Sequence, residues 1–281
     1  MRLIRRLTAH RVTAHRLTAR RVTAGALAAS ALVAAVVGLS TGPASATDGW
    51  WRPAAGVTWQ WQLTGTLNRS VNAAVYDIDA FDVTAADVSA LHAAGRKAIC
   101  YVNAGGYENW RPDASRFPSA VLGKALDGWA GERWLDVRRW DLLEPIMTAR
   151  FTMCRQKGFD GVEPDNVDGY ANSTGFPLTA TDQLTYNRRL ADLAHRLGLA
   201  VGLKNDLDQV GALLPSFDFA VNEECFQYRE CGVLSAFIKA GKPVFHVEYE
   251  VATSQFCPTT RGLGLSSMRK DFDLTAWRQP C

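Results

Sequence analysis

The sequence predicts an α/β fold, a single (β/α)8 TIM barrel, and three observations lead to this prediction. From Trp59 onward, short apolar runs rich in β-branched and aromatic residues alternate with longer stretches whose apolar residues have helical spacing. Eight such runs follow one another in an unbroken series. No linker rich in proline, glycine or serine interrupts the chain after residue 56, so one closed barrel is favoured over two smaller domains.

The expected elements follow in chain order, with seven or eight helices between the strands. Glycines at 95, 158, 198 and 241 end several helical stretches just before the next strand, where a left-handed cap is needed. The stretch from Gly105 to Arg139 is expected as an elaborated loop after strand three. An open doubly wound sheet is the alternative, but no Gly-x-Gly-x-x-Gly turn follows the first strand. The expected strands are 59–63, 73–78, 97–103, 160–164, 200–204, 218–222, 243–248 and 263–268, and the clearest helices are 85–94, 142–157, 181–197 and 233–240.

The first 46 residues have the composition of a secretory signal peptide. Their charges are all basic and lie between Arg2 and Arg21, and an apolar run follows. The small residues Ala44-Ser45-Ala46 come last and form the expected cleavage site. A membrane anchor is the alternative, but the apolar run is shorter than the roughly 20 residues that a span needs. We therefore expect cleavage after Ala46, a single (β/α)8 domain over 47–281 and an extracellular protein.

Removing the leader reverses the sign of the net charge. The whole chain has a formal charge of +3, but the leader holds 7 of the 31 basic residues and none of the 28 acidic ones, which leaves −4. A mildly acidic domain has no excess of positive charge that would attract the phosphates of nucleic acid. We expect a monomer that binds no nucleic acid and has no membrane association once the leader is cleaved.

All six cysteines lie after the leader, and an even number in an exported chain favours disulfides. The expected pairs are Cys225 with Cys231, Cys257 with Cys281, and Cys100 with Cys154; only the first rests on a local argument, its short spacing. No Cys-x-x-Cys pair is present. We therefore expect no bound metal and no organic cofactor.

Acidic residues gather where the expected strands end. In a parallel barrel the strand ends at the carboxyl side form the active site. Five of the eight ends carry at least one acid, in the segments 77–79, 163–166, 204–206, 222–224 and 248–250. Two carboxyl groups in one pocket are what the hydrolysis of a glycosidic bond requires, because one protonates the leaving oxygen and the other attacks or activates water.

Other chemistries are less well supported. His92, His195 and His246 do not accompany the acids at the spacing of metal ligands, and no Gly-x-Ser-x-Gly elbow indicates a Ser-His-Asp triad. A redox or nucleotide-binding protein lacks its cysteine spacing and its phosphate-binding turn.

Several segments of the chain carry a resemblance to a known family. They are 59–63, 76–79, 101–105 with 110–112, 158–168 and 222–225. The Glu-Pro-Asp-Asn motif at 163–166 and the Asn-Glu-x-Cys motif at 222–225 are specific in combination. Through them the sequence resembles glycoside hydrolase family 114, the endo-α-1,4-polygalactosaminidases and relatives, from Trp59 to the seventh strand.

The resemblance implies that Asp165 and Glu223 form the catalytic pair, with Glu223 as general acid/base and Asp165 as nucleophile or charge stabiliser. The residues alone leave alternatives open, because Glu163 shares strand parity with Asp165 and Glu224 is adjacent to Glu223. A second interpretation of Glu163 is a carboxylate inside the barrel held by Lys204.

Substrate-binding residues are expected beside the pair. Trp110, in a rim loop, is the best candidate for stacking on sugar, whereas Trp59 and Trp61 are equally compatible with the core. The polar candidates are Asp77, Asp79, Tyr101, Asn103, Glu163, Lys204, Asn205, Glu224 and Glu248.

The resemblance further implies an endo-acting enzyme on α-1,4-linked, galactosamine-containing polysaccharide of the galactosaminogalactan type. Two alternatives remain: a carbohydrate-binding barrel without activity, and a glycosidase that acts on a different exopolysaccharide.

Overall fold

Eight parallel strands form the central sheet and follow one another in chain order. The computed structural model describes residues 49–281, so the expected leader and its cleavage site lie outside the described residues. All eight expected strands are confirmed, with ends that differ by three residues at most. They are β1 (Trp59–Gln62), β2 (Val75–Asp79), β3 (Lys97–Asn103), β7 (Gly161–Asp165), β8 (Ala200–Lys204), β9 (Phe219–Glu223), β10 (Val244–Glu248) and β11 (Ser266–Arg269), and the short β12 (Gln279–Pro280) is antiparallel to β11.

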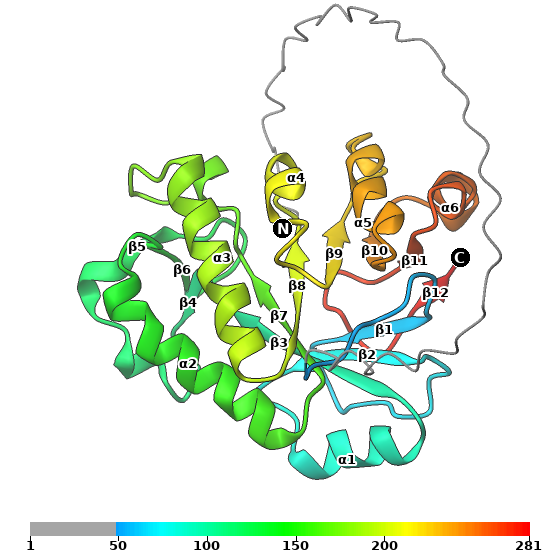
Figure 1. Ribbon diagram of the computed structural model, residues 1–281, viewed down its shortest axis with the longest axis horizontal. Helices are drawn as coiled ribbons and strands as arrows, with labels where there is room; N and C mark the ends of the chain where they lie inside the picture. Colours follow the sequence, from blue (N-terminus) through cyan, green and yellow to red (C-terminus); the bar gives the residue numbers. More distant parts are fainter. Residues whose placement is uncertain (1–48) are drawn as a thin grey trace, which may run out of the picture. The chain divides into compact units, whose positions relative to one another are not determined.

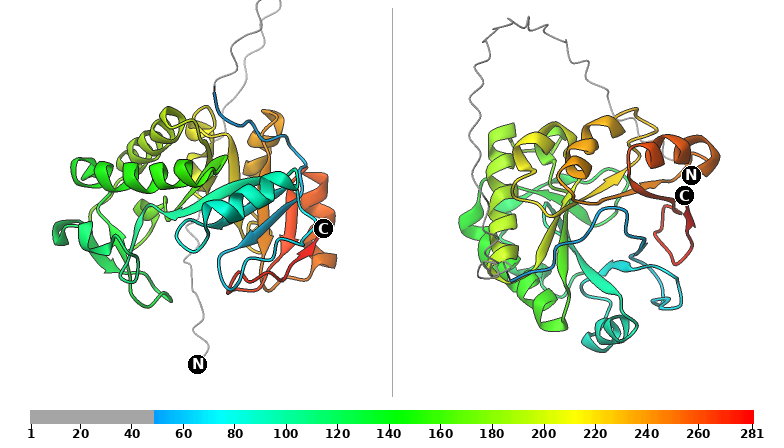
Figure 2. Two further views of the ribbon diagram at one scale, coloured as in Figure 1. Left: turned by 90° about the horizontal axis from the view of Figure 1, so that it is seen from below. Right: turned by 45° about the vertical axis from the view of Figure 1, so that its right-hand side comes forward.

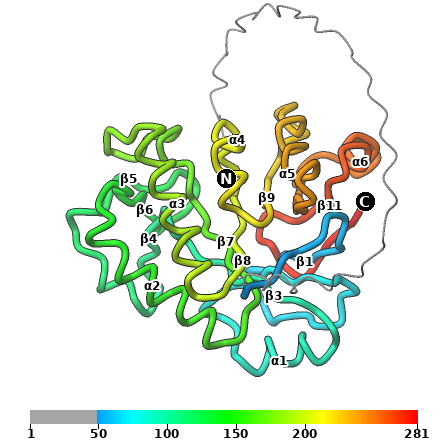
Figure 3. The backbone as a smooth tube through the Cα atoms, in the orientation of Figure 1, coloured from blue at the N-terminus to red at the C-terminus, as the bar shows by residue number. Residues whose placement is uncertain are grey.

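The sheet curls so that its two outer strands approach each other, as Figure 3 shows. Near the start of both strands, the Trp59 indole donates to the Ser266 carbonyl at 2.8 Å and the Ser266 hydroxyl donates to Val57 O at 2.7 Å. At the opposite end, the amide of Leu63 donates to the carbonyl of Leu274 at 2.9 Å. Side chains and the C-terminal segment therefore close the (β/α)8 barrel between β1 and β11.

Helices lie around the outside of the curled sheet, with α2 and α3 beside β7 and β8 (Figure 1). Residues 49–281 contain six α-helices, so the expectation of seven or eight was wrong. No helix joins β1 to β2, because that connection folds around Gln62, whose amide donates to the carbonyls of Thr64 and Thr66. The helices are α1 (Ala85–Ala93), α2 (Trp140–Lys157), α3 (Ala180–Arg196), α4 (Val210–Leu213), α5 (Ser235–Lys239) and α6 (Thr253–Gly262).

Local sequence accounts for where the long helices begin and end. Capping boxes pair Thr84 with Asp87 at the start of α1 and Thr179 with Asp182 at the start of α3. Gly158 ends α2 at a φ of 92°, in the left-handed region that glycine adopts most easily. Five 3-10 turns accompany the helices, at Ala114–Arg116, Ser119–Val121, Gly169–Ala171, Leu207–Gln209 and Cys231–Leu234.

The expected elaborated loop after strand three is confirmed and contains a small sheet of its own, which Figure 2 shows beside the barrel. Its strands are β4 (Gly106–Glu108), β5 (Leu122–Ala125) and β6 (Glu132–Leu135), in the order β4-β6-β5. Two buried ion pairs fix it, since Arg111 binds Asp79 of β2 at 2.6 Å and Arg150 of α2 binds Asp113 at 2.8 Å. The loop is thereby held against the rim of the barrel.

The alternation of side chains along each strand separates two apolar clusters. Inside the barrel, Trp59, Val75, Ile99, Phe219 and Phe245 pack together. A larger cluster fills the space between the outer face of the sheet and the helices. The polar side chains of the site project into the barrel above the inner cluster, two or four residues further along the same strands.

All three expected disulfides are confirmed. Cys100–Cys154 joins β3 to α2, Cys225–Cys231 closes a short loop after β9, and Cys257–Cys281 ties the C-terminal residue to α6. Within residues 49–281 there is no helix with the length and apolar character needed to cross a membrane.

Candidate active site

The centre of the site is the ammonium group of Lys204, at the end of β8. Its side chain is 4 % exposed, and its nitrogen lies 2.8 Å from Asp165 Oδ1, 3.2 Å from Glu223 Oε2 and 3.6 Å from Glu163 Oε1. The nitrogen also lies 4.9 Å from the ring centroid of Trp61 on β1. Burial lowers the pKa of Lys204, but the three carboxyl groups outweigh it and hold the pKa well above its ordinary value. The positive charge of Lys204 therefore stabilises three neighbouring carboxyl groups at once.

Asp165, the last residue of β7, is held as a carboxylate. Its Oδ2 accepts a hydrogen bond from the Tyr101 hydroxyl at 2.8 Å, and its Oδ1 accepts one from the Asn166 amide at 2.7 Å. Burial raises the pKa of Asp165, but the charge of Lys204 and these hydrogen bonds prevail and keep the pKa below its ordinary value. An ionised carboxylate at this place is suited to attack an anomeric carbon.

Glu223 ends β9 on the other side of Lys204, and its side chain is 23 % exposed. Tyr249 donates its hydroxyl to Oε1, and the Asn205 amide donates to Oε2 at 3.2 Å. Burial, followed by the charge of Glu223, raises the pKa of Tyr249 well above its ordinary value, so the phenol remains a donor. Glu223 thus faces the opening of the site, with Oε1 held by Tyr249 and Oε2 held by Asn205.

The backbone is strained where these strands end. Asn166, Asn205 and Glu224 have φ values of 60°, 49° and 62°, which residues other than glycine rarely adopt. The loop after β3 approaches the same place so closely that a Cβ on Gly105 would lie 1.7 Å from the Asn166 carbonyl oxygen. The turns that aim Asp165 and Glu223 are therefore tightly constrained.

Below the pair, Asp77 of β2 and Glu163 of β7 are completely buried. Within residues 49–281, none of their four carboxyl oxygens has a hydrogen-bond partner. Burial, together with the charge of Glu163, raises the pKa of Asp77 well above its ordinary value, and burial raises the pKa of Glu163 to about 7. Both residues were expected to bind substrate, but the structure places them under the site, out of contact with solvent.

Asn103 and Asp79 were also expected to bind substrate and are buried instead. The Asn103 amide donates to Glu132 at 3.0 Å and its oxygen accepts from the Gly106 amide at 2.7 Å, so it ties the elaborated loop to β3. Asp79 is bound by both terminal nitrogens of Arg111. The structure gives both side chains a role in fixing the rim.

The remaining candidates lie further from Lys204. Glu248 is fully buried and bonded to His246 and to the Phe226 amide, on the side of β10 opposite Tyr249. Glu224 is nearly buried in the turn after β9. Trp110 is 53 % exposed in the rim loop. The structure therefore brings together Tyr101, Glu163, Asp165, Lys204, Asn205 and Glu223 and keeps Glu248 apart from them.

Three acidic residues near the site were not among the sequence-based candidates. Burial raises the pKa of Asp168 to about 6, of Asp206 to about 7 and of Glu132 to about 8. Asp168 and Asp206 follow β7 and β8, where the acidic strand ends already signalled them. Glu132 comes from β6, and no spacing in the sequence relates it to β3.

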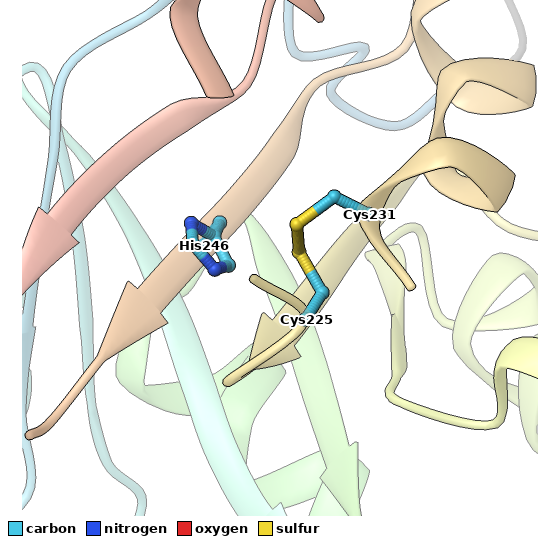
Figure 4. Close-up of side chains that lie close together, drawn as sticks. All are labelled: Cys225, Cys231 and His246. Atoms are coloured by element: carbon cyan, nitrogen blue, oxygen red, sulfur yellow. A yellow bond between two sulfur atoms is a disulfide. The ribbon is translucent and has the colours of Figure 1, made fainter. Parts of the chain in front are cut away.

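Figure 4 shows the imidazole of His246, on β10, beside the Cys225–Cys231 disulfide. The ligand atoms of the three residues lie within 4.8 Å of one another. The two sulfur atoms are bonded together, and the ring nitrogens of His246 bond Ser267 and Glu248 at 3.0 and 2.9 Å. Because each of these atoms has its partner, the group is a structural cluster.

A pair of acids at the carboxyl ends of β7 and β9, inside a (β/α)8 barrel, defines a glycoside hydrolase. The chain belongs to glycoside-hydrolase family GH114, whose model matches residues 40–281. The resemblance found in the sequence is thereby confirmed.

Solved structures agree with this assignment. Ega3 of Aspergillus fumigatus, solved in complex with galactosamine, is 41 % identical, with a TM-score of 0.79 over 82 % of this chain and 97 % of that chain. The glycoside hydrolase domain of PelA from Pseudomonas aeruginosa shares the fold at 14 % identity, with a TM-score of 0.61 over 80 % and 98 % of the two chains. A search of the curated proteins found no match.

Proposed function

We propose that the protein is a secreted, endo-acting hydrolase of α-1,4-linked, galactosamine-containing polysaccharide, in which Asp165 is the nucleophile and Glu223 the general acid/base. The observation that carries the choice of this pair is that one buried ammonium group lies between these two carboxyl groups. The galactosamine bound in the Aspergillus fumigatus structure, at 41 % identity, supports the substrate class.

The roles follow from the hydrogen bonds. Asp165 is held ionised by Lys204, Tyr101 and the Asn166 amide, so it can attack the anomeric carbon. Glu223, exposed toward the opening, protonates the oxygen of the departing sugar as the glycosidic bond breaks, and then takes a proton from the attacking water.

The separation of the acids favours retention of the anomeric configuration. Asp165 Oδ1 and Glu223 Oε2 lie 2.8 and 3.2 Å from the same nitrogen, so the two oxygens are at most 6.0 Å apart, the two distances placed end to end. Inverting enzymes separate their carboxyl groups by about 6.5 to 9.5 Å to leave room for water. We therefore propose a covalent glycosyl intermediate on Asp165.

The rim suits a polymer with free amino groups. Asp168, on the loop after β7 and near the pair, is partly exposed and would meet a cationic sugar. Trp110, with its exposed ring, is the proposed stacking surface for a sugar further along the chain. Tyr101, Lys204 and Asn205 complete the proposed site.

Three disulfides within residues 49–281 support export, because such bonds persist in oxidising compartments. Together with the expected leader, they support an extracellular protein, and we propose that it acts as a monomer.

The test is reducing-end release from purified α-1,4-galactosaminogalactan, with the parent compared with Asp165→Asn, Glu223→Gln and the exposed control Glu144→Gln on α2. We expect oligosaccharides from the parent and the control, and at least about a hundredfold loss in both site variants. Proton NMR of the first product should show the α-anomer.

Two other outcomes would redirect the proposal. Retention of the polymer by the parent without any release would favour the carbohydrate-binding alternative. Full activity of Glu223→Gln, with loss in Glu224→Gln, would move the acid/base role to the neighbouring residue.

A further inference from the structure

The segment 270–278 forms a tightly bonded loop at the carboxyl end of β11, where the barrel closes. Lys270 is fully buried and donates to the carbonyl oxygens of Thr275 and Trp277 at 2.6 and 2.5 Å. The Asp271 carboxylate accepts hydrogen bonds from the amide and the hydroxyl of Thr275 at 2.9 and 2.6 Å. The side chains of Lys270 and Asp271 therefore fix the course of the loop from within.

The same loop is bonded to the end of β1 at the rim. The amide of Leu63 donates to the carbonyl of Leu274 at 2.9 Å, and the hydroxyl of Thr64 donates to the carbonyl of Asp273 at 2.6 Å. A loop held in this way presents its outward side chains in a fixed position. A ligand that binds them loses little affinity to the ordering of the loop.

Phe272 lies on this loop, and its side chain is 45 % exposed. Its ring packs on the ring of Tyr249, with centroids 4.6 Å apart and planes inclined by 36°. Tyr249 is itself buried and donates its hydroxyl to Glu223. The Tyr249 ring therefore links an exposed aromatic side chain to one of the two proposed catalytic carboxyl groups.

An aromatic ring at this place matches the apolar face of a galactosamine unit. The axial oxygen of a galacto-configured sugar lies on one face of the sugar ring and leaves several C–H bonds together on the opposite face. Such an apolar face gains free energy when it is buried against an aromatic side chain. The protonated amino group of the sugar is attracted in addition by the electron-rich face of the aromatic ring.

We propose that Phe272 is a specificity-determining residue that stacks on the departing sugar, on the Glu223 side of the bond that breaks. This inference rests on the proposed function, in which Glu223 meets that sugar. The loop that carries Trp110 follows β3, beside β7 and Asp165. The loop that carries Phe272 follows β11, beside β10 and Tyr249. The two exposed rings therefore serve opposite ends of the bound polymer.

Two variants separate stacking on sugar from packing on Tyr249. Phe272→Leu keeps an apolar side chain against Tyr249 but removes the aromatic face, whereas Phe272→Trp keeps an aromatic face. We expect kcat/KM for reducing-end release from α-1,4-galactosaminogalactan to fall about tenfold in the leucine variant and to stay within about twofold of the parent in the tryptophan variant. Because the side chain is exposed, both variants should fold.

A residue that merely supports Tyr249 would tolerate leucine better than the larger tryptophan. That order, or equal values of kcat/KM in the two variants, would overturn the proposal. A parent that releases no reducing ends would instead refute the proposed function, so the two failures can be told apart.

A second measurement isolates the binding of the sugar from the catalytic steps. The α-glycosyl fluoride of a galactosamine oligosaccharide would form the proposed glycosyl intermediate on Asp165 with loss of fluoride. Water and added galactosamine then compete for the intermediate, and the second gives a lengthened oligosaccharide. We expect the ratio of transfer to hydrolysis to fall about tenfold in Phe272→Leu and to be kept in Phe272→Trp.

A change that only disturbs Glu223 would slow both reactions of the intermediate and leave their ratio unchanged. An unchanged ratio in Phe272→Leu would therefore overturn the proposal. Transfer requires the retaining mechanism, so if the parent shows none, the comparison of the two variants on the polymer decides the role of Phe272 alone.

Discussion

The ammonium nitrogen of Lys204, on β8, lies 2.8 Å from Oδ1 of Asp165 on the adjacent strand β7, and both groups are largely buried. Neighbouring parallel strands place these residues side by side at the carboxyl end of the barrel. Each charge therefore depends on the other for its stability inside the protein.

Replacing Lys204 with methionine should abolish this dependence. Without the positive charge, the pKa of Asp165 should rise, so the acidic limb of kcat/KM should move to higher pH, because the nucleophile must be ionised. We expect kcat to fall by about a hundredfold or more. The pH profile of reducing-end release measures both effects, and an unmoved acidic limb would contradict the role given to Lys204.

Tyr249→Phe should remove the hydrogen bond to Glu223 and leave the aromatic ring, which packs 4.6 Å from Phe272, in place. A hydrogen bond to a charged group contributes about 1.5–3 kcal/mol, so kcat should fall about 10- to 100-fold with little change in the melting temperature. Tyr101→Phe is the matched variant on Asp165. Wild-type kcat in both variants would show that the phenols do not assist the acids.

Gly105→Ala should destabilise the protein and lower its activity together, because the new Cβ would overlap the Asn166 carbonyl oxygen at 1.7 Å. Overpacking of this kind costs about 1–3 kcal/mol, and here the obstacle is backbone, which cannot rotate away. Gly211→Ala is the control, since no atom lies within 4 Å of its Cβ. Stability in urea and kcat should fall only in the first variant, because alanine is favoured over glycine inside helix α4.

Glu132→Gln should change the pH dependence of stability. The pKa of Glu132, raised chiefly by burial to about 8, exceeds its ordinary value of 4.5 in the unfolded chain. The folded state therefore binds more protons between these values, and stability is lost as the pH rises from about 4.5 through 8. The variant should lose less stability over this window. Melting temperatures at pH 5 and pH 9 test the difference, which should be absent if Glu132 titrates normally.

Replacing Cys100 and Cys154 with alanine should cost more stability than the same change at Cys225 and Cys231. The first disulfide closes a separation of 54 residues and the second one of only 6. Loop entropy alone then predicts losses of about 4 and about 2 kcal/mol. Unfolding in urea measures both, and equal losses would mean that local packing, rather than the loop, sets the contribution.

Strand alternation by itself predicts where two adjacent side chains, Glu248 and Tyr249, point. On β10, Phe245 and Val247 are the apolar residues that fill the barrel, so Tyr249 continues the inner face and Glu248 must point outward. The same alternation places Glu163 and Asp165 on one face of β7. Sequence patterns do not state how far a side chain lies below the rim, and only the structure shows that Asp77 and Glu163 are completely buried.

The sequence by itself determined the eight strands, the position of the elaborated loop, the family and the residues at the strand ends, because period-two alternation and short motifs are local properties of the chain. Only the tertiary structure decided that Lys204 serves three acids, that Tyr249 reaches Glu223, and that Glu132 of a distant loop meets Asn103. Those relationships join residues from different strands and loops, and the curvature of the closed barrel, which no local pattern encodes, sets the distances between them.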